Sequence, residues 1–176
     1  MTTIPGIEAI ALVGGKNQRL YLNARVRYQQ QAAPQTQQQK VGNELLRLEY
    51  AAHCALDVIE ERSLVRNANG ELTPAAVSFL GLVLTLEDLA IYAMVTSTKL
   101  RIMLLITPGE FKVKDLDCLT VLRAVHTCYL SYISNPFHAL PSPNTGLSFM
   151  NFGQANAHVD IKSDLFDKRI KAIGGW

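Results

Sequence analysis

The stretch that decides the fold is AVSFLGLVLTLEDLAIYAMVTSTKLRIMLLI, residues 76–106. It contains three runs of apolar and β-branched residues, which predict strands over Ala76–Leu84, Leu89–Thr96 and Lys99–Ile106. Glu87-Asp88 and Ser97-Thr98 separate these runs, and such short polar connections are typical of hairpins. Both alternating sets of positions are apolar, so the sheet must be buried on both faces and covered by helices on both sides.

The segment before this stretch supplies two further strands and a helix. Ile7–Val13 and Arg19–Val26 predict a hairpin, because a glycine-rich turn separates two apolar runs. A helix is predicted over 43–62, with Asn43 as its N-cap. Its apolar residues recur at three- and four-residue spacing, which predicts one buried face. That expected face consists of Leu45, Leu48, Ala52, Ala55, Leu56 and Ile59.

Two helices are predicted after the strands. The first runs from Asp115, expected to cap it, to about Ser134, where Asn135-Pro136 ends it. The second covers about Ser163–Ile173. The resulting order is strand-strand-helix-strand-strand-strand-helix-helix, an α+β class. We therefore expect a longin-like (profilin-like) α/β/α sandwich, in which a five-stranded antiparallel sheet has one helix on one face and two on the other.

Length and composition indicate a single globular domain over 1–176. Two segments are expected to be loops: a flexible glutamine-rich loop over 28–40 and a long polar loop over 140–158. Asn69-Gly70 predicts a turn. The formal net charge of +2 gives no general argument for binding nucleic acid or a membrane surface.

The helix over 43–62 has a second apolar stripe on the side opposite its buried face. Leu46, Tyr50, Cys54 and Val58 step by four residues, and His53, Asp57 and Glu61 run beside them. One sheet covers only one side of a helix, so either an intramolecular loop or a partner protein must cover this stripe. Apolar anchors with a charged rim are typical of protein interfaces, which favours the partner. The predicted partner-binding residues are Leu46, Tyr50, His53, Asp57 and Glu61.

The reactive side chains give no pattern of an active site. His53-Cys54 and the pair His126 and Cys128 are neighbours at one or two residues on a helix, so their side chains diverge. The histidines are too scattered to supply converging metal ligands, and no nucleotide-binding glycine motif is present. We therefore expect no catalytic residues, no metal and no cofactor. Three cysteines without paired metal spacing favour a reduced, cytosolic compartment.

Several motifs, in their order and spacing, resemble the sedlin family, and in particular the subunit 2-like branch of the trafficking (transport) protein particle complex, TRAPP. They are Asn43-Glu44-Leu45, HCALDVIEE at 53–61, Leu80-Gly81-Leu82, TLED at 85–88, VTSTKLR at 95–101, Asn135-Pro136-Phe137 and SDLFD at 163–167. The similarity extends over most of the chain from Ile7 to Ile173. The glutamine-rich loop 28–40 and the loop 140–158 depart from the family pattern.

This resemblance implies a longin-like fold and a non-catalytic adaptor or assembly subunit. TRAPP complexes act as tethers and guanine-nucleotide-exchange factors for Rab-type GTPases in ER-to-Golgi and intra-Golgi vesicle transport. The implied partners are other TRAPP subunits and, indirectly, Rab-type GTPases. The implied location is the cytoplasm, with peripheral association with ER–Golgi intermediate and Golgi membranes through the complex. In the family, the aspartate of the His-x-x-Leu-Asp motif lies at a partner-sensitive position, which is Asp57 here.

Two alternatives stay open. One is a free-standing longin-type regulator that binds a SNARE or a small GTPase directly. A longin SNARE needs a heptad helix of roughly 60 residues after the domain, whereas about forty residues without heptads follow Asn135. The other alternative is a small enzyme that uses a cysteine, which one fast-reacting thiol at neutral pH would reveal.

Overall fold

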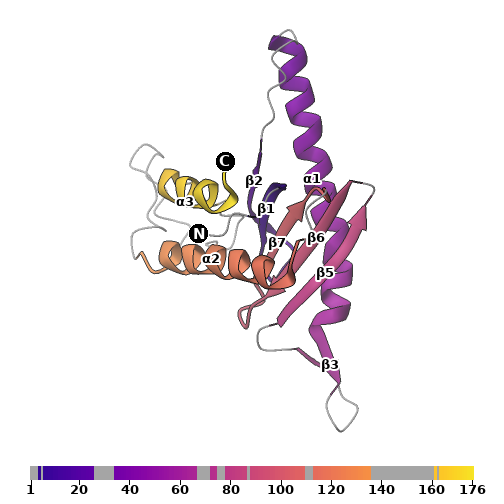
Figure 1. The fold of residues 1–176 in the computed structure, drawn as a ribbon. Helices are drawn as coiled ribbons and strands as arrows, with labels where there is room; N and C mark the ends of the chain where they lie inside the picture. Colours follow the sequence, from indigo (N-terminus) through magenta and orange to yellow (C-terminus); the bar gives the residue numbers. More distant parts are fainter. Residues whose placement is uncertain are drawn as a thin grey trace, which may run out of the picture.

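The computed structural model describes residues 4, 6–25, 34–66, 72–74, 78–86, 88–109, 113–135, 161 and 163–176. Its main sheet is antiparallel, with the strand order β2-β1-β7-β6-β5 (Figure 1). These strands are β1 (Ile7–Val13), β2 (Arg19–Ala24), β5 (Ser78–Leu86), β6 (Leu89–Val95) and β7 (Arg101–Ile106). The helices are α1 (Pro34–Ser63), α2 (Asp115–Ile133) and α3 (Asp164–Gly174). A separate hairpin consists of β3 (Leu64–Arg66) and β4 (Leu72–Pro74).

The central strands are buried on both faces, as their sequence predicted. All six residues of β7 are buried. Ile102 and Leu104 pack into the core beneath α2 and α3, whereas Met103 and Leu105 pack beneath α1. Alternate side chains of a strand point to opposite faces, so one apolar run serves two cores. Neither face of β7 can be left uncovered, and the fold must have three layers.

The three layers confirm the predicted fold class. Figure 1 shows α1 on one face of the sheet and α2 with α3 on the other. The chain is therefore an α+β sandwich with a five-stranded antiparallel sheet, one helix on one face and two on the other, as expected for a longin-like fold. The β3–β4 hairpin was not predicted, because strands of three residues are too short to show alternation.

The start of α1 corrects one prediction. The helix begins at Pro34, so a flexible loop over 28–40 is wrong for residues 34–40. Asn43 consequently lies inside the helix and is not its N-cap. Glutamine is a good helix former and proline suits the first helical position, so the helix extends from its packed part at little cost. Residues 28–33, the turn at Asn69-Gly70 and the loop 140–158 lie outside the described residues.

The other boundaries differ by a few residues. β7 begins at Arg101, two residues later than predicted, because a turn occupies the preceding segment. There the Thr96 amide donates to the Leu100 carbonyl at 2.9 Å, and Lys99 has a left-handed φ of 60°. β2 ends at Ala24, β5 spans Ser78–Leu86 and β6 ends at Val95. The N-cap of α2 is Lys114 and not Asp115, which instead lies in the first turn.

The last helix is fixed to β2 by an aromatic and a polar contact. Ser163 caps α3 by accepting a hydrogen bond from the Phe166 amide. The ring of Phe166 meets that of Tyr21 edge-on, with centroids 4.9 Å apart. The Tyr21 hydroxyl donates to the Asp167 carboxylate at 2.6 Å, and burial together with this bond raises the pKa of Tyr21. This helix is therefore a docked part of the domain.

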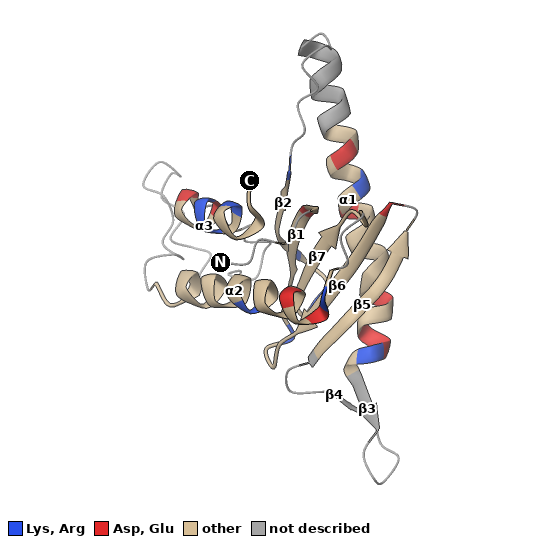
Figure 2. Ribbon diagram, in the orientation of Figure 1, with Lys and Arg blue, Asp and Glu red and all other residues tan. Residues whose placement is uncertain are grey.

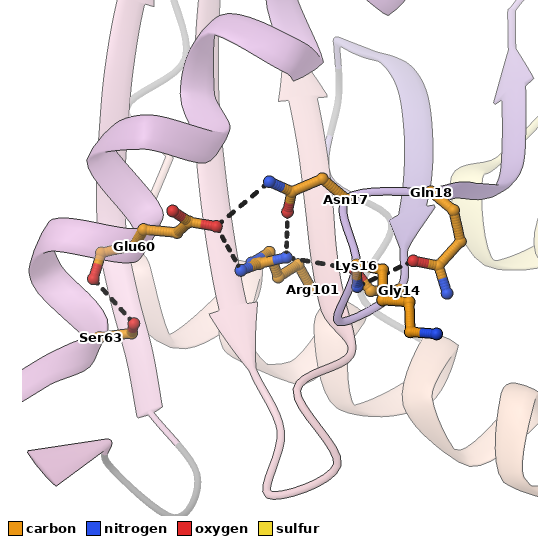
Figure 3. Close-up of polar contacts among 7 residues, drawn as sticks. All are labelled: Gly14, Lys16, Asn17, Gln18, Glu60, Ser63 and Arg101. Atoms are coloured by element: carbon orange, nitrogen blue, oxygen red, sulfur yellow. Dashed lines mark hydrogen bonds and ion pairs between the residues drawn. The ribbon is translucent and has the colours of Figure 1, made fainter.

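A buried arginine joins three elements on the α1 side of the sheet. Arg101 in β7 is only 8% exposed. Its guanidinium donates to the Gly14 carbonyl at 3.1 Å, to the side-chain oxygen of Asn17, and to the Glu60 carboxylate at 2.8 Å (Figure 3). Asn17 also donates to Glu60 at 3.2 Å. The β1–β2 turn, β7 and α1 are thus held by a single cation.

We predict that Arg101→Met lowers the free energy of unfolding by about 2 kcal/mol, because it removes the donor to the Asn17 side-chain oxygen and one of the donors to Glu60 and to the Gly14 carbonyl. Half of the Glu60 side chain is exposed, which keeps the loss below that of a fully buried pair. Urea unfolding measures the change. Arg47→Met is the control, since Arg47 pairs with Asp88 at the surface and its loss is expected to cost less than about 1 kcal/mol. Equal losses in the two variants would contradict a special role for Arg101.

Candidate protein-interaction surface

One side of α1 packs tightly on the sheet through small residues. The buried helix residues are Leu48, Ala51, Ala52, Ala55, Leu56 and Ile59. They meet Ala9, Ala11 and Ala93 of the sheet in the same cluster, so the helix backbone can approach the strands closely. Leu45, predicted to be buried, is exposed, because the packed part of α1 starts at Leu48 and residues 42–47 are all exposed.

Polar contacts on both flanks fix the rotation of α1 about its axis. On the β2 flank, Glu49 pairs with Arg19 at 2.9 Å, and Glu60 pairs with Arg101. On the β5 flank, Arg47 forms an ion pair with Asp88, and Arg62 donates to the Leu82 carbonyl at 2.7 Å. The helix thus contacts the sheet through glutamates along one flank and through arginines along the other. The face turned away from the sheet is therefore defined by the fold.

This α1 outer face consists of Leu46, Tyr50, His53, Asp57 and Glu61, and all five residues are exposed. Leu46 and Tyr50 are 67% and 69% exposed, which is unusual for large apolar side chains. The structure thus places the predicted partner-binding residues together on one free side of the helix. Their role in binding a partner stays a prediction.

The apolar stripe is narrower than the sequence indicated. Cys54 and Val58 are only partly exposed, and Val58 packs against the edge of the core. The neighbouring Cys54 thiol, one turn further along, raises the pKa of Tyr50. The phenol therefore stays neutral at physiological pH. Two neutral anchors, Leu46 and Tyr50, with Asp57 and Glu61 beyond them, make up the surface.

Among the described residues, the hollow that borders this surface is too small for a small molecule. His53 lies toward β2, where it borders a hollow lined by Ala11, Val13, Arg19, Leu22, Glu49 and Ala52. The hollow measures about 10 Å³, which is about enough for one water molecule. The arrangement suits contact with a large complementary surface.

The surroundings of Cys118 and Cys128 disfavour the thiolate that a nucleophilic cysteine needs. Burial raises the pKa of Cys118 to about 11, and the nearby Asp115 and Asp117 act in the same direction. Burial also raises the pKa of Cys128. A nucleophilic cysteine needs a lowered pKa, so both thiols are protonated and inert near pH 7. Within the described part of the chain, no three His, Cys, Asp or Glu residues lie close enough together to hold a metal ion. No helix of that part is long and apolar enough to cross a membrane.

The residues that set the orientation of this surface were not predicted from the sequence. Arg101 lies in the strand RIMLLI, whose other five residues are apolar. A lone charge in a buried strand signals a buried ionic partner, so this feature was visible in the sequence. The partner Glu60 could not be identified from the sequence, because the two paired residues are 41 positions apart.

Comparison with known proteins identifies the family. The family model for sedlin matches residues 12–175. A trafficking protein particle complex subunit 2-like protein of Dictyostelium discoideum is 28% identical over 148 residues, covering 84% of this chain and 91% of the relative. The protein of that name from Xenopus tropicalis is 24% identical over 106 residues, covering 60% and 75% of the two chains.

A relative from fission yeast extends the similarity to a third lineage. An uncharacterized protein of Schizosaccharomyces pombe is 28% identical over 141 residues, covering 80% of this chain and 84% of its own length. The sedlin model covers nearly the whole sandwich, from the end of β1 to the end of α3. The chain therefore belongs to the sedlin family.

Proposed function

We propose that this chain is a non-catalytic adaptor or assembly subunit of a trafficking protein particle complex, and that the α1 outer face docks another subunit. The observation that carries the proposal is the free, apolar-centred face of α1 in a sedlin-family chain. Several relatives are named as subunit 2-like proteins of that complex, which supports the assignment.

The surface is built for protein contact. Leu46 and Tyr50 provide anchors that lose water on docking, and the acidic residues Asp57 and Glu61 provide a charged rim. The flanking contacts of α1 hold this face in one orientation before a partner arrives. A preorganised surface loses less conformational entropy on binding, so few anchors can suffice.

The proposal also includes the function of the assembled complex. The complex would act as a tether and as a nucleotide-exchange factor for Rab-type GTPases in ER-to-Golgi and intra-Golgi transport. This chain would meet the GTPase indirectly and would reach ER–Golgi intermediate and Golgi membranes only as part of the complex. The raised pKa values of Cys118 and Cys128 support a subunit without a reaction of its own.

We predict that Asp57→Tyr weakens docking while the fold survives. Asp57 is exposed, so the change leaves the core intact but adds bulk and removes a charge in the rim of the α1 outer face. The measurement is co-elution of the variant with co-expressed trafficking-particle subunits in size-exclusion chromatography, together with thermal melting. Asp164→Tyr on α3 is the matched control, because it makes the same exchange at an exposed site in the opposite layer. Co-elution of Asp57→Tyr at wild-type strength would count against the proposal.

Tyr50→Ala is expected to weaken docking by about 2 kcal/mol, roughly thirtyfold in Kd, which is the size of a typical aromatic hot spot. Tyr50 is largely exposed in the isolated chain, so unfolding in urea should change by less than about 0.5 kcal/mol. Titration calorimetry against the partner subunit measures the affinity. An unchanged affinity would place the interface elsewhere on the molecule.

Thiol labelling separates the adaptor from a cysteine enzyme. We predict slow modification of Cys118 at pH 7, with a rate that increases as the pH approaches about 11 or when urea unfolds the chain. The reason is that only the thiolate reacts, and burial raises the pKa of this thiol. Mass spectrometry of the alkylated native protein gives the rate for each cysteine. A single cysteine that reacts faster than free cysteine at pH 7 would revive an enzymatic function.

A further inference from the structure

A second exposed helix face lies on the other side of the molecule, on the outward side of α2. Leu116, Thr120, Arg123, Thr127 and Leu130 are all exposed, and we name them the α2 seam. Leu116 and Leu130 are 70% and 44% exposed. The five residues recur at alternating intervals of four and three, so they lie in one line along the helix.

The α2 seam is poor in charge for an exposed helix. Arg123 is the one Asp, Glu, Lys or Arg between Cys118 and Ile133. Figure 2 shows α2 in tan over most of its length, with its acidic residues gathered at the N-terminal end. By contrast, α3 has five charged residues in eleven. Depletion of charge with retention of arginine is the composition of an interface core.

The threonines of the α2 seam are already satisfied within the helix. The Thr120 hydroxyl donates to the Leu116 carbonyl at 2.8 Å, and the Thr127 hydroxyl donates to the Arg123 carbonyl at 3.0 Å. When a partner covers these side chains, each hydroxyl keeps its acceptor within the helix. Removing water from them therefore costs little free energy. No described carboxylate forms an ion pair with Arg123. The guanidinium is therefore the one group of the α2 seam that needs an outside partner when it is covered.

Symmetry decides against a second copy of this chain as that partner. Arg123 is at the midpoint of the α2 seam, seven residues from both Leu116 and Leu130. An antiparallel pairing about a twofold axis would match each leucine with a leucine, but it would also place the two Arg123 guanidinium groups against each other. A parallel twofold pairing in register does the same. Two like charges in contact oppose such a dimer.

We propose that the α2 seam docks an amphipathic helix of another protein, with apolar side chains against Leu116 and Leu130 and a carboxylate against Arg123. The alternating spacing matches the contact line of two helices that cross at about 20°. The α2 seam lies in the layer opposite α1, so both surfaces can be occupied at once (Figure 1). This inference does not depend on the proposed role of the α1 outer face.

The test uses two synthetic amphipathic helices of about 21 residues, which is three heptads. They are identical except that the central seam residue is Glu in one and Lys in the other. Fluorescence anisotropy measures their binding to the full chain and to Arg123→Glu, Leu130→Asp and Leu165→Asp. The last variant is the matched control, because Leu165 is also exposed but lies on α3. Thermal melting checks that each variant is folded.

The wild-type chain is expected to bind the Glu helix at least tenfold more tightly than the Lys helix, and Arg123→Glu is expected to reverse that preference. Leu130→Asp should weaken binding at least tenfold, and Leu165→Asp should leave it within twofold of wild type. Absence of binding at millimolar peptide, equal binding of the two helices, or binding that survives Leu130→Asp would overturn the proposal. So would a wild-type dimer, detected by sedimentation, that Leu130→Asp dissociates, because a second copy would then be the occupant.

Discussion

The two-sided burial of β1 and β7 is the constraint on which the structure depends. Nearly every side chain of these strands is buried, because alternate residues enter two different cores. Both faces must then be covered, and three helices do so with one on one face and two on the other. The α1 side is lined by alanines, which lets that helix lie close to the strands, whereas larger side chains such as Phe166 fill the other side.

The α1 outer face is a consequence of this packing. A helix that buries one side on a sheet leaves the other side free, and contacts along both flanks determine which residues that side presents. Among these contacts, those of the buried Arg101 join three elements, because they link β7 and the β1–β2 turn to Glu60 of α1. The contacts that hold the helix therefore also determine which of its residues are exposed.

The sequence predicted the fold well where apolar patterning decides it. β1 spans the residues predicted for it, and the layer order follows from strands in which both alternating sets of positions are largely apolar. The prediction was wrong for segments in which the pattern of apolar residues gives no information. The first turns of α1 are rich in glutamine, so helix propensity sets their structure, and Leu45 lies before the part of the helix that reaches the sheet. Helical spacing predicted which residues form the α1 outer face. The pairing of Glu60 with Arg101 depends on tertiary structure, so the sequence pattern could not predict it.

We propose that this chain, a member of the sedlin family, works as a docking subunit within a larger assembly. The most direct test is native purification of the tagged full chain from its own cells, with the subunit composition and stoichiometry determined by mass spectrometry. We expect other trafficking-particle subunits to be recovered in stoichiometric amounts. Recovery of the chain alone, or with only a SNARE or a small GTPase, would contradict it and would leave the fold correct but the function wrong.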